Sequence, residues 1–426
     1  MNKVRAGYKM TELGEIPIEW EVKRLEECTN KITDGSHTSP APVEISNYKI
    51  CTVANMKKYK LDLENSTNIS EEDYIRLIKN GCSAERGDVL LSKDGTVGKT
   101  LVYSQSGENI VFLSSIAIIR PQKNILLGEY LNQYLQETKT LERLSNTKTG
   151  SAIKRIVLKD IKNIKIIIPK IQEQERIASI LSTVDEQIDN VDALIEKNKE
   201  LKKGLMQTLL TKGIGHTKFK KTEIGEVPSE WYIKSIDEIT KEVYRYPTYY
   251  VIEYVEEGIA EIRGELLNDD ASIKKESFRY ISEKTAKKFP RTKLEGGDIV
   301  ISVRGTIGKV GYITEELAGS NITANLLRVS MNRNIMNEHF VKQLFLSDIM
   351  KRKFDEITTA TTIKTFKVPE FKQIILAIPT KDEQDKIASI LLEVDKKIEE
   401  HENKKQKLEE LKKGLMQQLL TGRIRV

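Results

Sequence analysis

Hydrophobic side chains recur every three or four residues along two long stretches of the chain, residues 171–212 and 380–426. Steps that alternate between four and three residues place them on one side of an α-helix, as two helices packed side by side require. The positions expected to pair are Ile177, Leu181, Val184 and Ile188 in the first stretch, and Ile387, Leu391, Val394 and Ile398 in the second. A single helix would leave this side in water, so the pattern predicts that the two helices pack on each other.

Each predicted helix has some 40 residues, which corresponds to roughly 60 Å at about 1.5 Å per residue. Polar residues interrupt the apolar side of the second helix at His401, Lys405 and Lys412. We expect a role in packing or register for His401. The pattern therefore predicts the helix pair but leaves the packing of its middle open.

The chain is also a tandem repeat with an offset of about 210 residues. TELGEIPIEWEVKRLEE at 11–27 returns as TEIGEVPSEWYIKSIDE at 222–238, and GDVLLSKDGTVGKT at 87–100 returns as GDIVISVRGTIGKV at 297–310. Both helical stretches end in LKKGLMQ followed by a leucine pair. So long a period excludes a solenoid and indicates a domain duplication, which predicts pseudo-two-fold symmetry.

The parts outside the long helices have the composition of mixed β-sheet and helix. Short β-branched runs separated by Gly, Asp, Asn and Ser predict strands, and the spacing in 129–144 and 338–354 predicts one helix in each. Thr380 and Glu383 are spaced for a capping box at the second long helix. We therefore predict an α+β protein with globular domains at 1–170 and 222–379, each followed by a long helix, and a linker at 213–221.

Composition excludes some classes of protein but does not decide the function. The 426 residues are 39% hydrophobic and 31% charged, as in globular proteins of two or three domains. No apolar run approaches the ~20 residues that span a bilayer, and the first residues lack the apolar core of a signal peptide. Three cysteines form neither a disulfide framework nor a metal-ligand spacing, so we expect a cytoplasmic protein without a metal site. The net charge of +6 favours a polyanionic partner only weakly.

The two halves differ most in one segment of their globular parts. Residues 30–80 scarcely match residues 240–290, although the segments on either side correspond. A duplicated protein that keeps its scaffold and varies these loops would present two different binding surfaces. Neutral divergence of surface loops is the alternative.

The segment GTVGKT (95–100) resembles a phosphate-binding loop, but its spacing is wrong. G-x-x-x-x-G-K-[ST] requires a glycine at position 93, where the chain has Lys93, and the second copy ends in Val310 where a hydroxyl should bind magnesium. This argues against a nucleotide hydrolase. A strand followed by a glycine turn fits better, either as a purely structural turn or as a contact with a phosphate group. The residues that such a turn would bring to the surface are Lys93, Asp94, Thr96, Arg304 and Thr306.

Three further polar segments are candidates for binding. DGSHTSP (34–40) contains a histidine near a carboxylate, but no counterpart stands in the second half, so a hydrogen-bonding surface loop is preferred over a catalytic pair. TKTGSAIKR (147–155) corresponds to TTATTIKTF (358–366), and both combine hydroxyls with lysines that suit phosphates and base edges; a solvated basic loop is the alternative. Tyrosines around Arg245 are suited to stacking on bases, or belong to the core.

The residues quoted so far resemble those of the DNA-specificity subunits of type I restriction–modification enzymes over essentially the full chain. The features that carry the resemblance are GEIPIEW and GEVPSEW, DGSHTSP, GDVLLSKDGTVGK, the strand and proline before EQERIASIL and EQDKIASIL, and LKKGLMQ in both copies. The resemblance implies two target recognition domains separated by two long antiparallel coiled-coil spacer helices. Each recognition domain is then expected to bind one half of a bipartite double-stranded DNA site.

The resemblance also implies partners and the absence of a catalytic centre in this chain. We expect two methyltransferase subunits to dock on it and restriction or translocase subunits to join them, with S-adenosylmethionine, Mg and ATP on those partners. No methylation motif, G-x-G-x-x-G loop or nuclease cluster stands in the sequence. The rival is a duplicated coiled-coil adaptor that binds a protein or glycan. The residues predicted to contact DNA are Asp34, Ser36, His37, Thr38, Lys93, Asp94, Thr96, Lys148, Lys154, Tyr246, Tyr249, Arg263, Arg304, Thr306, Thr362 and Lys364.

Overall fold

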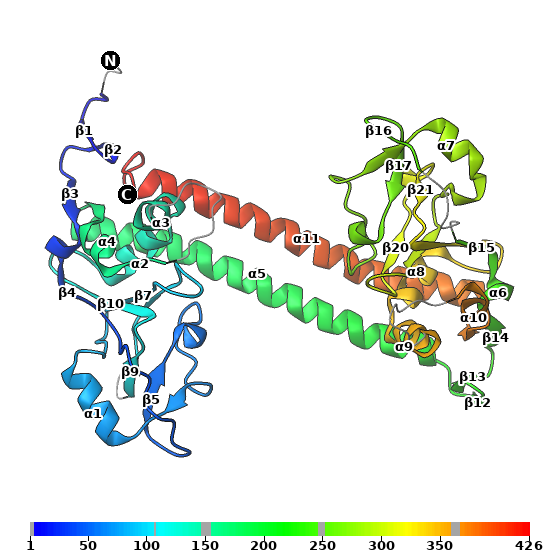
Figure 1. The fold of residues 1–426 in the computed structure, drawn as a ribbon, viewed down its shortest axis with the longest axis horizontal. Coiled ribbons are helices and arrows are strands. Elements are labelled where there is room, and N and C mark those ends of the chain that lie inside the picture. The colour runs from blue at the N-terminus through cyan, green and yellow to red at the C-terminus, as the bar shows by residue number, and fades with distance from the viewer. Residues whose placement is uncertain (1–3, 106–107, 146–154, 246–251, 359–366) are drawn as a thin grey trace. The chain divides into compact units, whose positions relative to one another are not determined.

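The computed structural model describes residues 4–105, 108–145, 155–245, 252–358 and 367–426. The chain divides into two compact units: unit 1 comprises residues 1–192 and 403–426, and unit 2 comprises residues 193–402. Both divisions fall within long helices, α5 (Ile171–Lys212) and α11 (Lys381–Leu419) (Figure 1). Each unit therefore contains one globular part and one end of each long helix.

The long helices pack in opposite directions within each unit. In unit 1 the start of α5, with Ile177 and Leu181, shares a core with Leu419 near the end of α11. In unit 2 the end of α5, with Leu209, shares a core with Ile387 at the start of α11. The predicted apolar side is buried along both helices, with Val184 and Ile398 half-buried. The antiparallel pairing that the family resemblance implied is thus present in both units.

The polar interruptions at Lys405 and Lys412 form ion pairs between the two helices. Lys412 Nζ lies 2.8 Å from Asp185 Oδ2 in unit 1, and Lys202 Nζ lies 2.7 Å from Asp395 Oδ1 in unit 2. Each aspartate also accepts a hydrogen bond from a buried glutamine of its own globular part. Paired charges at such positions specify register in helix pairs. The interhelical ion pairs are Lys412–Asp185, Lys405–Asp192, Lys202–Asp395 and Lys199–Glu402.

Each long helix is fastened to its globular part at its first turn. Gln174 Nε2 donates to the carbonyl oxygens of Ile125 and Pro169, at 2.8 and 2.9 Å. Gln384 Nε2 donates in the same way to Ile335 and Pro379, both at 3.0 Å. Because a buried amide needs partners, these bonds fix where each helix leaves its sheet.

A buried tryptophan and a glutamate form a second repeated contact at the helix start. Trp20 Nε1 donates to Glu173 Oε2 at 2.9 Å in unit 1, and Trp231 Nε1 donates to Glu383 Oε2 at 3.0 Å in unit 2. The Thr380 side chain accepts from the Glu383 backbone at 3.4 Å. The Glu383 carboxylate turns instead toward tryptophan and His216, so the predicted capping box is wrong in its second half.

The main sheet of each unit has four antiparallel strands in the same order. In unit 1 the order is β4-β10-β7-β8, and in unit 2 it is β15-β22-β19-β20. The strands of unit 1 are β4 (Thr29–Asp34), β7 (Val89–Ser92), β8 (Thr100–Val102) and β10 (Ile116–Pro121). Those of unit 2 are β15 (Thr240–Arg245), β19 (Ile299–Ser302), β20 (Val310–Tyr312) and β22 (Leu326–Met331).

Smaller elements complete each unit. Each globular part begins with a hairpin, followed by a strand that pairs with the last strand before the long helix. In unit 1 the hairpin is β1 (Tyr8–Thr11) with β2 (Gly14–Pro17), and the second pair is β3 (Glu21–Arg24) with β11 (Lys165–Ile168). In unit 2 the hairpin is β12 (Phe219–Thr222) with β13 (Gly225–Pro228), and the second pair is β14 (Tyr232–Ser235) with β23 (Ile375–Ile378). The second sheets contain β5 (Tyr48–Cys51), β6 (Thr67–Asn68) and β9 (Asn109–Phe112), and β16 (Tyr254–Val255), β17 (Ile259–Ile262), β18 (Arg279–Ile281) and β21 (Asn321–Ile322). The short helices nearby are α1 (Glu71–Lys79), α4 (Leu158–Asn163), α6 (Ile236–Ile239), α7 (Glu283–Lys288) and α10 (Val368–Lys372).

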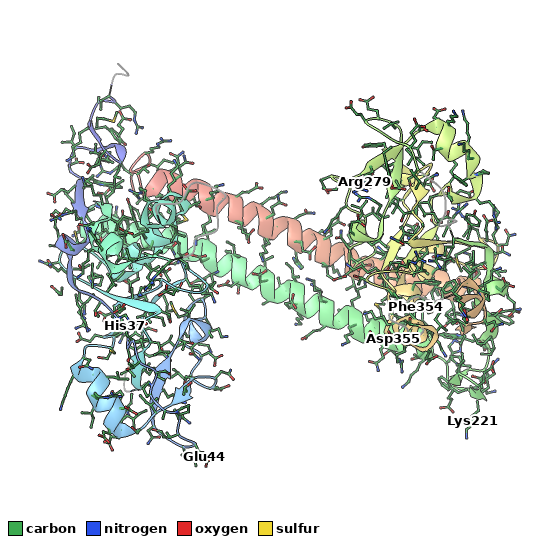
Figure 2. All side chains as sticks on the ribbon, in the orientation of Figure 1. His37, Glu44, Lys221, Arg279, Phe354 and Asp355 are labelled. Atoms are coloured by element: carbon green, nitrogen blue, oxygen red, sulfur yellow. The ribbon has the colours of Figure 1, made fainter. Side chains whose placement is uncertain are left out.

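The helices predicted at 129–144 and 338–354 are each broken into two, which corrects that prediction. Unit 1 has α2 (Gly128–Gln136) and α3 (Thr138–Ser145), and unit 2 has α8 (Glu338–Leu346) and α9 (Asp348–Ile357). The Ser347 side chain caps α9 by accepting from Met350 N at 3.4 Å. Such a cap begins a new helix inside an apolar pattern that otherwise continues. On α9, Phe354 enters the core while its neighbour Asp355 is exposed (Figure 2).

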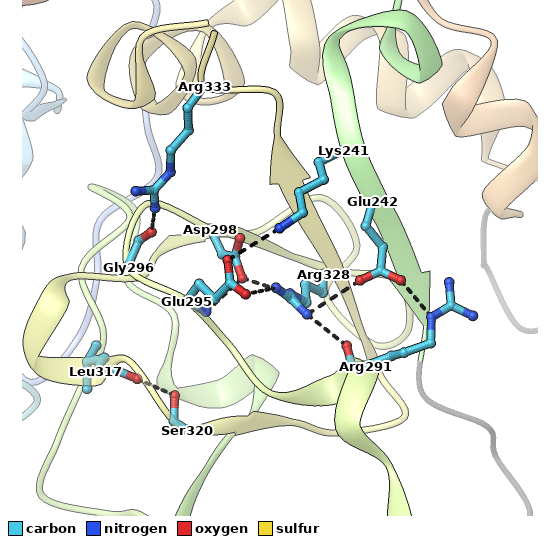
Figure 3. A network of polar contacts seen from close by, with 10 residues as sticks. All are labelled: Lys241, Glu242, Arg291, Glu295, Gly296, Asp298, Leu317, Ser320, Arg328 and Arg333. Atoms are coloured by element: carbon cyan, nitrogen blue, oxygen red, sulfur yellow. Dashed lines mark hydrogen bonds and ion pairs between the residues drawn. The ribbon is translucent and has the colours of Figure 1, made fainter.

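An arginine joins the strands of each main sheet; it is buried in unit 2 and half-buried in unit 1. In unit 2, Arg328 of β22 lies 2.7 Å from Asp298 Oδ2 and also contacts Glu242 and Glu295, at 3.5 and 3.7 Å (Figure 3). Arg291 adds a second positive charge next to these three carboxylates through its own ion pair with Glu242. In unit 1, Arg120 forms the matching contacts with Asp88 and Glu85. This ion cluster is therefore part of the duplicated scaffold.

A loop of unit 1 is attached directly to α5. Lys58, between β5 and β6, lies 2.6 Å from Asp189 Oδ1 and 3.4 Å from Asp185 Oδ1. Burial raises the pKa of the adjacent Tyr59 to about 12. The corresponding loop of unit 2, residues 268–270, carries two aspartates instead of basic residues. The globular part of unit 1 is thus held to the long helix by contacts that the described residues of unit 2 do not repeat.

The three cysteines are buried and unpaired, as expected for a chain without a disulfide framework. Burial raises the pKa of Cys28 to about 11 and that of Cys51 to about 12. Among the described residues, none of the helices combines the length and apolar character that crossing a membrane would require.

Candidate nucleic-acid interface

The predicted glycine turn is present in both units and is built by one serine. Ser92 Oγ donates to Thr96 O at 2.6 Å and accepts from Lys99 N at 2.7 Å. Ser302 Oγ donates to Thr306 O and accepts from Lys309 N at 2.9 Å. Glycines with positive φ stand at matching places in both turns. The buried serines therefore hold two turns of the same shape at the same end of both sheets.

In unit 1 the structure corrects the position predicted for Lys93. Its side chain is only 3% exposed, and its Nζ lies 3.3 Å from Asp34 Oδ2 and 3.2 Å from Asp94 Oδ2. The end of β7 directs Lys93 toward the carboxylate at the end of β4, and a buried ammonium group requires such partners. Lys93 is therefore a positioning residue, whereas Asp94 keeps 34% of its side chain exposed and Thr96 is exposed.

The loop after β4 mixes structural and exposed residues. Ser36, predicted as a contact residue, is 6% exposed, and its hydroxyl donates to Thr38 O at 2.6 Å. Its backbone N–H donates to Phe112 O, so Ser36 shapes the loop. His37 is 72% exposed, with Nε2 3.3 Å from Asp34 Oδ1 (Figure 2). His37 and Thr38 remain available to a ligand.

Arg155 extends this group of polar side chains. Its Nε lies 3.1 Å from Asp94 Oδ1, and Ile156 N donates to Lys93 O. The basic segment that the sequence singled out thus ends beside the turn. The predicted residues Lys148 and Lys154 lie outside the described residues, as do Tyr246, Tyr249, Thr362 and Lys364.

In unit 2 the turn presents Arg304 and Thr306 to solvent, as predicted. Arg263 is different, because its guanidinium is already bound within the unit by Ser277 O and Glu265. Its side chain is 13% exposed, so a structural role explains it better than DNA contact. Arg245, around which the sequence places tyrosines suited to stacking on bases or to the core, is the last residue of β15.

Replacing Lys93 by methionine should destabilise unit 1 by about 2 kcal/mol, because Asp34 and Asp94 would face each other without the buried cation. This loss of unfolding free energy is smaller than that for a fully buried ion pair, because His37 still contacts Asp34 and Arg155 still contacts Asp94. Lys99→Met, which removes an exposed lysine of the same turn, should change the unfolding free energy by less than about 0.5 kcal/mol. If urea unfolding shows that Lys93→Met and Lys99→Met lower the unfolding free energy equally, the structural role of Lys93 is contradicted.

A metal site is not indicated by the described residues, since these contain no cluster of three or more His, Cys, Asp or Glu side chains suited to hold an ion.

Comparison with known proteins gives consistent matches. A family model described as the type I restriction modification DNA specificity domain matches residues 17–202 and again 218–410. A putative type I restriction enzyme specificity subunit, MjaX, from Methanocaldococcus jannaschii is 28% identical across 99% of this chain and 97% of its own. The MjaVIII specificity subunit of that organism is 28% identical across 83% of each chain. None of these similarities supports the adaptor considered above.

Solved structures share the fold at low sequence identity. The S subunit of a type I restriction-modification system from M. genitalium has a TM-score of 0.55 and 16% identity, covering 96% of this chain and 97% of that chain. A chain from a structure of type I R-M complex assembly and conformational transition has a TM-score of 0.58 and 14% identity, covering 96% and 99%.

Proposed function

We propose that this chain, which belongs to the family of type I restriction modification DNA specificity domains, is the DNA sequence-specificity subunit of a type I restriction–modification complex. Each globular part binds one half of a bipartite double-stranded DNA site. The observation that carries this proposal is the pair of identically built turns that present different side chains, Asp94 in unit 1 and Arg304 in unit 2. Two turns of the same shape that carry different side chains are suited to a bipartite DNA site whose two halves differ in sequence.

The remaining roles follow from the long helices and from the partners. The recognition domains, residues 1–170 and 222–379, are carried by α5 and α11, which set the spacing of the half-sites and hold two methyltransferase subunits. A 42-residue helix such as α5 is about 63 Å long, more than one turn of B-DNA at roughly 34–36 Å. The chain itself is non-catalytic and acts in the cytoplasm. S-adenosylmethionine, Mg and ATP bind to the methyltransferase and restriction subunits.

Exchange of one recognition domain tests this function. Replacing residues 240–365 by those of a relative, in the full chain co-expressed with its methyltransferase, should change one half of the methylated sequence and leave the other half as it was. Mapping of methylated adenines in the host DNA measures both halves at once. The matched control exchanges residues 30–155 and should change the opposite half.

Two results would contradict the proposal. A change in both halves after a single exchange would mean that the domains do not bind independently. DNA affinity that does not fall with salt would mean that phosphate contacts by Lys and Arg contribute nothing, as expected for a chain that binds a protein or glycan instead.

A further inference from the structure

The two main sheets end in groups of side chains that occupy equivalent positions. Asp34 and Arg245 are the last residues of β4 and β15, and both strands have six residues. Asp94 and Arg304 both stand two residues after the serine that builds the turn. We call Asp34, Lys93 and Asp94 the sheet end of unit 1, and Arg245, Val303 and Arg304 the sheet end of unit 2.

Backbone pairing confirms that these positions correspond. In unit 1, β10 pairs Ala117 with Asp34 and Ile116 with Ser92. In unit 2, β22 pairs Leu327 with Arg245 and Leu326 with Ser302. The central strand therefore separates the two side chains by the same sheet geometry in both units.

The charged groups of the two sheet ends differ. Unit 1 has two carboxylates, which are held by the buried ammonium group of Lys93 and by Arg155, whose Nε lies 3.1 Å from Asp94 Oδ1. Unit 2 has two guanidinium groups, with the uncharged Val303 at the position of that lysine. Among the described residues, no carboxylate lies within ion-pair distance of Arg245 or Arg304, and the remaining residues of the sequence include no Asp or Glu.

Arg245 is also incompletely hydrogen-bonded. Its Nε donates to Ala324 O at 3.4 Å, but its buried Nη2 has no hydrogen-bond partner among the described residues. Burial and the nearby charge of Arg304 lower the pKa of Arg245. Two unpaired cations at one place cost stability, and a buried donor without a partner requires an explanation. A ligand that brings hydrogen-bond acceptors would supply one.

We propose that the two sheet ends bind base edges with opposite hydrogen-bonding polarity: Arg304 donates to O6 and N7 of a guanine in the half-site of unit 2, and Asp94 accepts from the amino group of a cytosine in the half-site of unit 1. This proposal rests on the proposed function. Arg–guanine and carboxylate–cytosine pairs follow from the groups that these bases display in the major groove.

The difference between the two sheet ends distinguishes bases from phosphates as the partner. If this scaffold position contacted the DNA backbone in both halves, the partly exposed carboxylate of Asp94 in unit 1 would face a phosphate group and weaken that contact. Base edges offer acceptors in some pairs and donors in others. A position that carries carboxylates in one half and guanidinium groups in the other is therefore suited to bases.

Selection from a library of random DNA duplexes tests the assignment. The full chain in complex with its methyltransferase subunits is compared with complexes that carry Arg304→Gln, Arg304→Lys or Asp94→Asn. We expect Arg304→Gln to lose about 10- to 100-fold of the discrimination for guanine at one position of one half-site, with the other half-site unchanged. Arg304→Lys keeps the charge but not the two-pronged geometry, so it should also lose discrimination. Asp94→Asn should alter one position of the opposite half-site.

Arg352→Gln is the matched control, because it removes an exposed arginine from α9 of the same unit without touching the turn; it should leave the selected sequence unchanged. If Arg304→Gln lowers affinity uniformly for all sequences and reduces the salt dependence, Arg304 binds a phosphate and the assignment is overturned. An unchanged guanine preference overturns it equally. A wild-type complex that selects no bipartite sequence would instead overturn the proposed function. Circular dichroism spectra and urea unfolding midpoints that match wild type show that the variants are folded.

Discussion

Inserting three heptads into each long helix should move the half-sites apart by about one turn of DNA. The insertions fall between Ile195 and Glu196 in α5 and between His401 and Glu402 in α11, which face each other according to the ion pairs Lys405–Asp192 and Lys202–Asp395. Whole heptads keep the apolar side in register. The 21 added residues lengthen each helix by about 32 Å, close to the ~34–36 Å of one B-DNA turn, so the displaced half-site should return to the face of the duplex that it had before the insertion.

Affinity for the original site should fall at least ~100-fold, because one recognition domain loses its half-site and each mismatched base pair costs about 1–3 kcal/mol. A site lengthened by about ten base pairs should restore binding, as measured by competition between duplexes of graded spacing. A single-heptad insertion is the control: it adds about 10 Å and turns the second half-site to another face, so neither site should bind well. Unchanged preference for the original spacing after the 21-residue insertion would show that the helices do not set it.

The long helices were predictable because their signal is local. A repeat of apolar residues within 40 positions defines the buried side of α5 without any knowledge of its partner. The ion pair between Lys412 and Asp185 is different, since these residues lie far apart in the sequence and meet only through the antiparallel register. Lys412 therefore appeared in the sequence as an interruption, and only the structure shows its partner.

The same difference between local and long-range signals explains which residues of the candidate interface were predicted correctly. Arg304 and Thr306 were placed correctly because a glycine turn exposes its own residues whatever surrounds it. Lys93 was placed wrongly because its burial depends on Asp34, which reaches it from another strand of the sheet. Arg245 was noticed only as the centre of a tyrosine cluster, since its charge becomes informative when Arg304 is known to be its neighbour.

Replacing Arg328 by methionine should lower the unfolding free energy of unit 2 by about 3–5 kcal/mol, because removal of one partner from a buried ion pair leaves the other charge without compensation. Arg328 is 4% exposed and Asp298 is 2% exposed. Each unit contains one of the chain's two tryptophans, Trp20 in unit 1 and Trp231 in unit 2. Urea unfolding followed by fluorescence in a Trp20→Phe background therefore reports on unit 2.

The second variant separates the charge from the loss of packing. Arg328→Met combined with Asp298→Asn removes the uncompensated charge and keeps an oxygen for the Glu295 N–H, which donates to Asp298 Oδ2 at 2.9 Å; it should recover more than half of the loss. In a Trp231→Phe background, Trp20 should show unit 1 unfolding as before, because its own cluster of Arg120 and Asp88 is intact. A loss below about 1 kcal/mol for Arg328→Met would mean that water or the neighbouring Arg291 compensates Asp298. The ion cluster of Arg328 and Asp298 would then have no role in holding the sheet that carries Arg245 and Arg304.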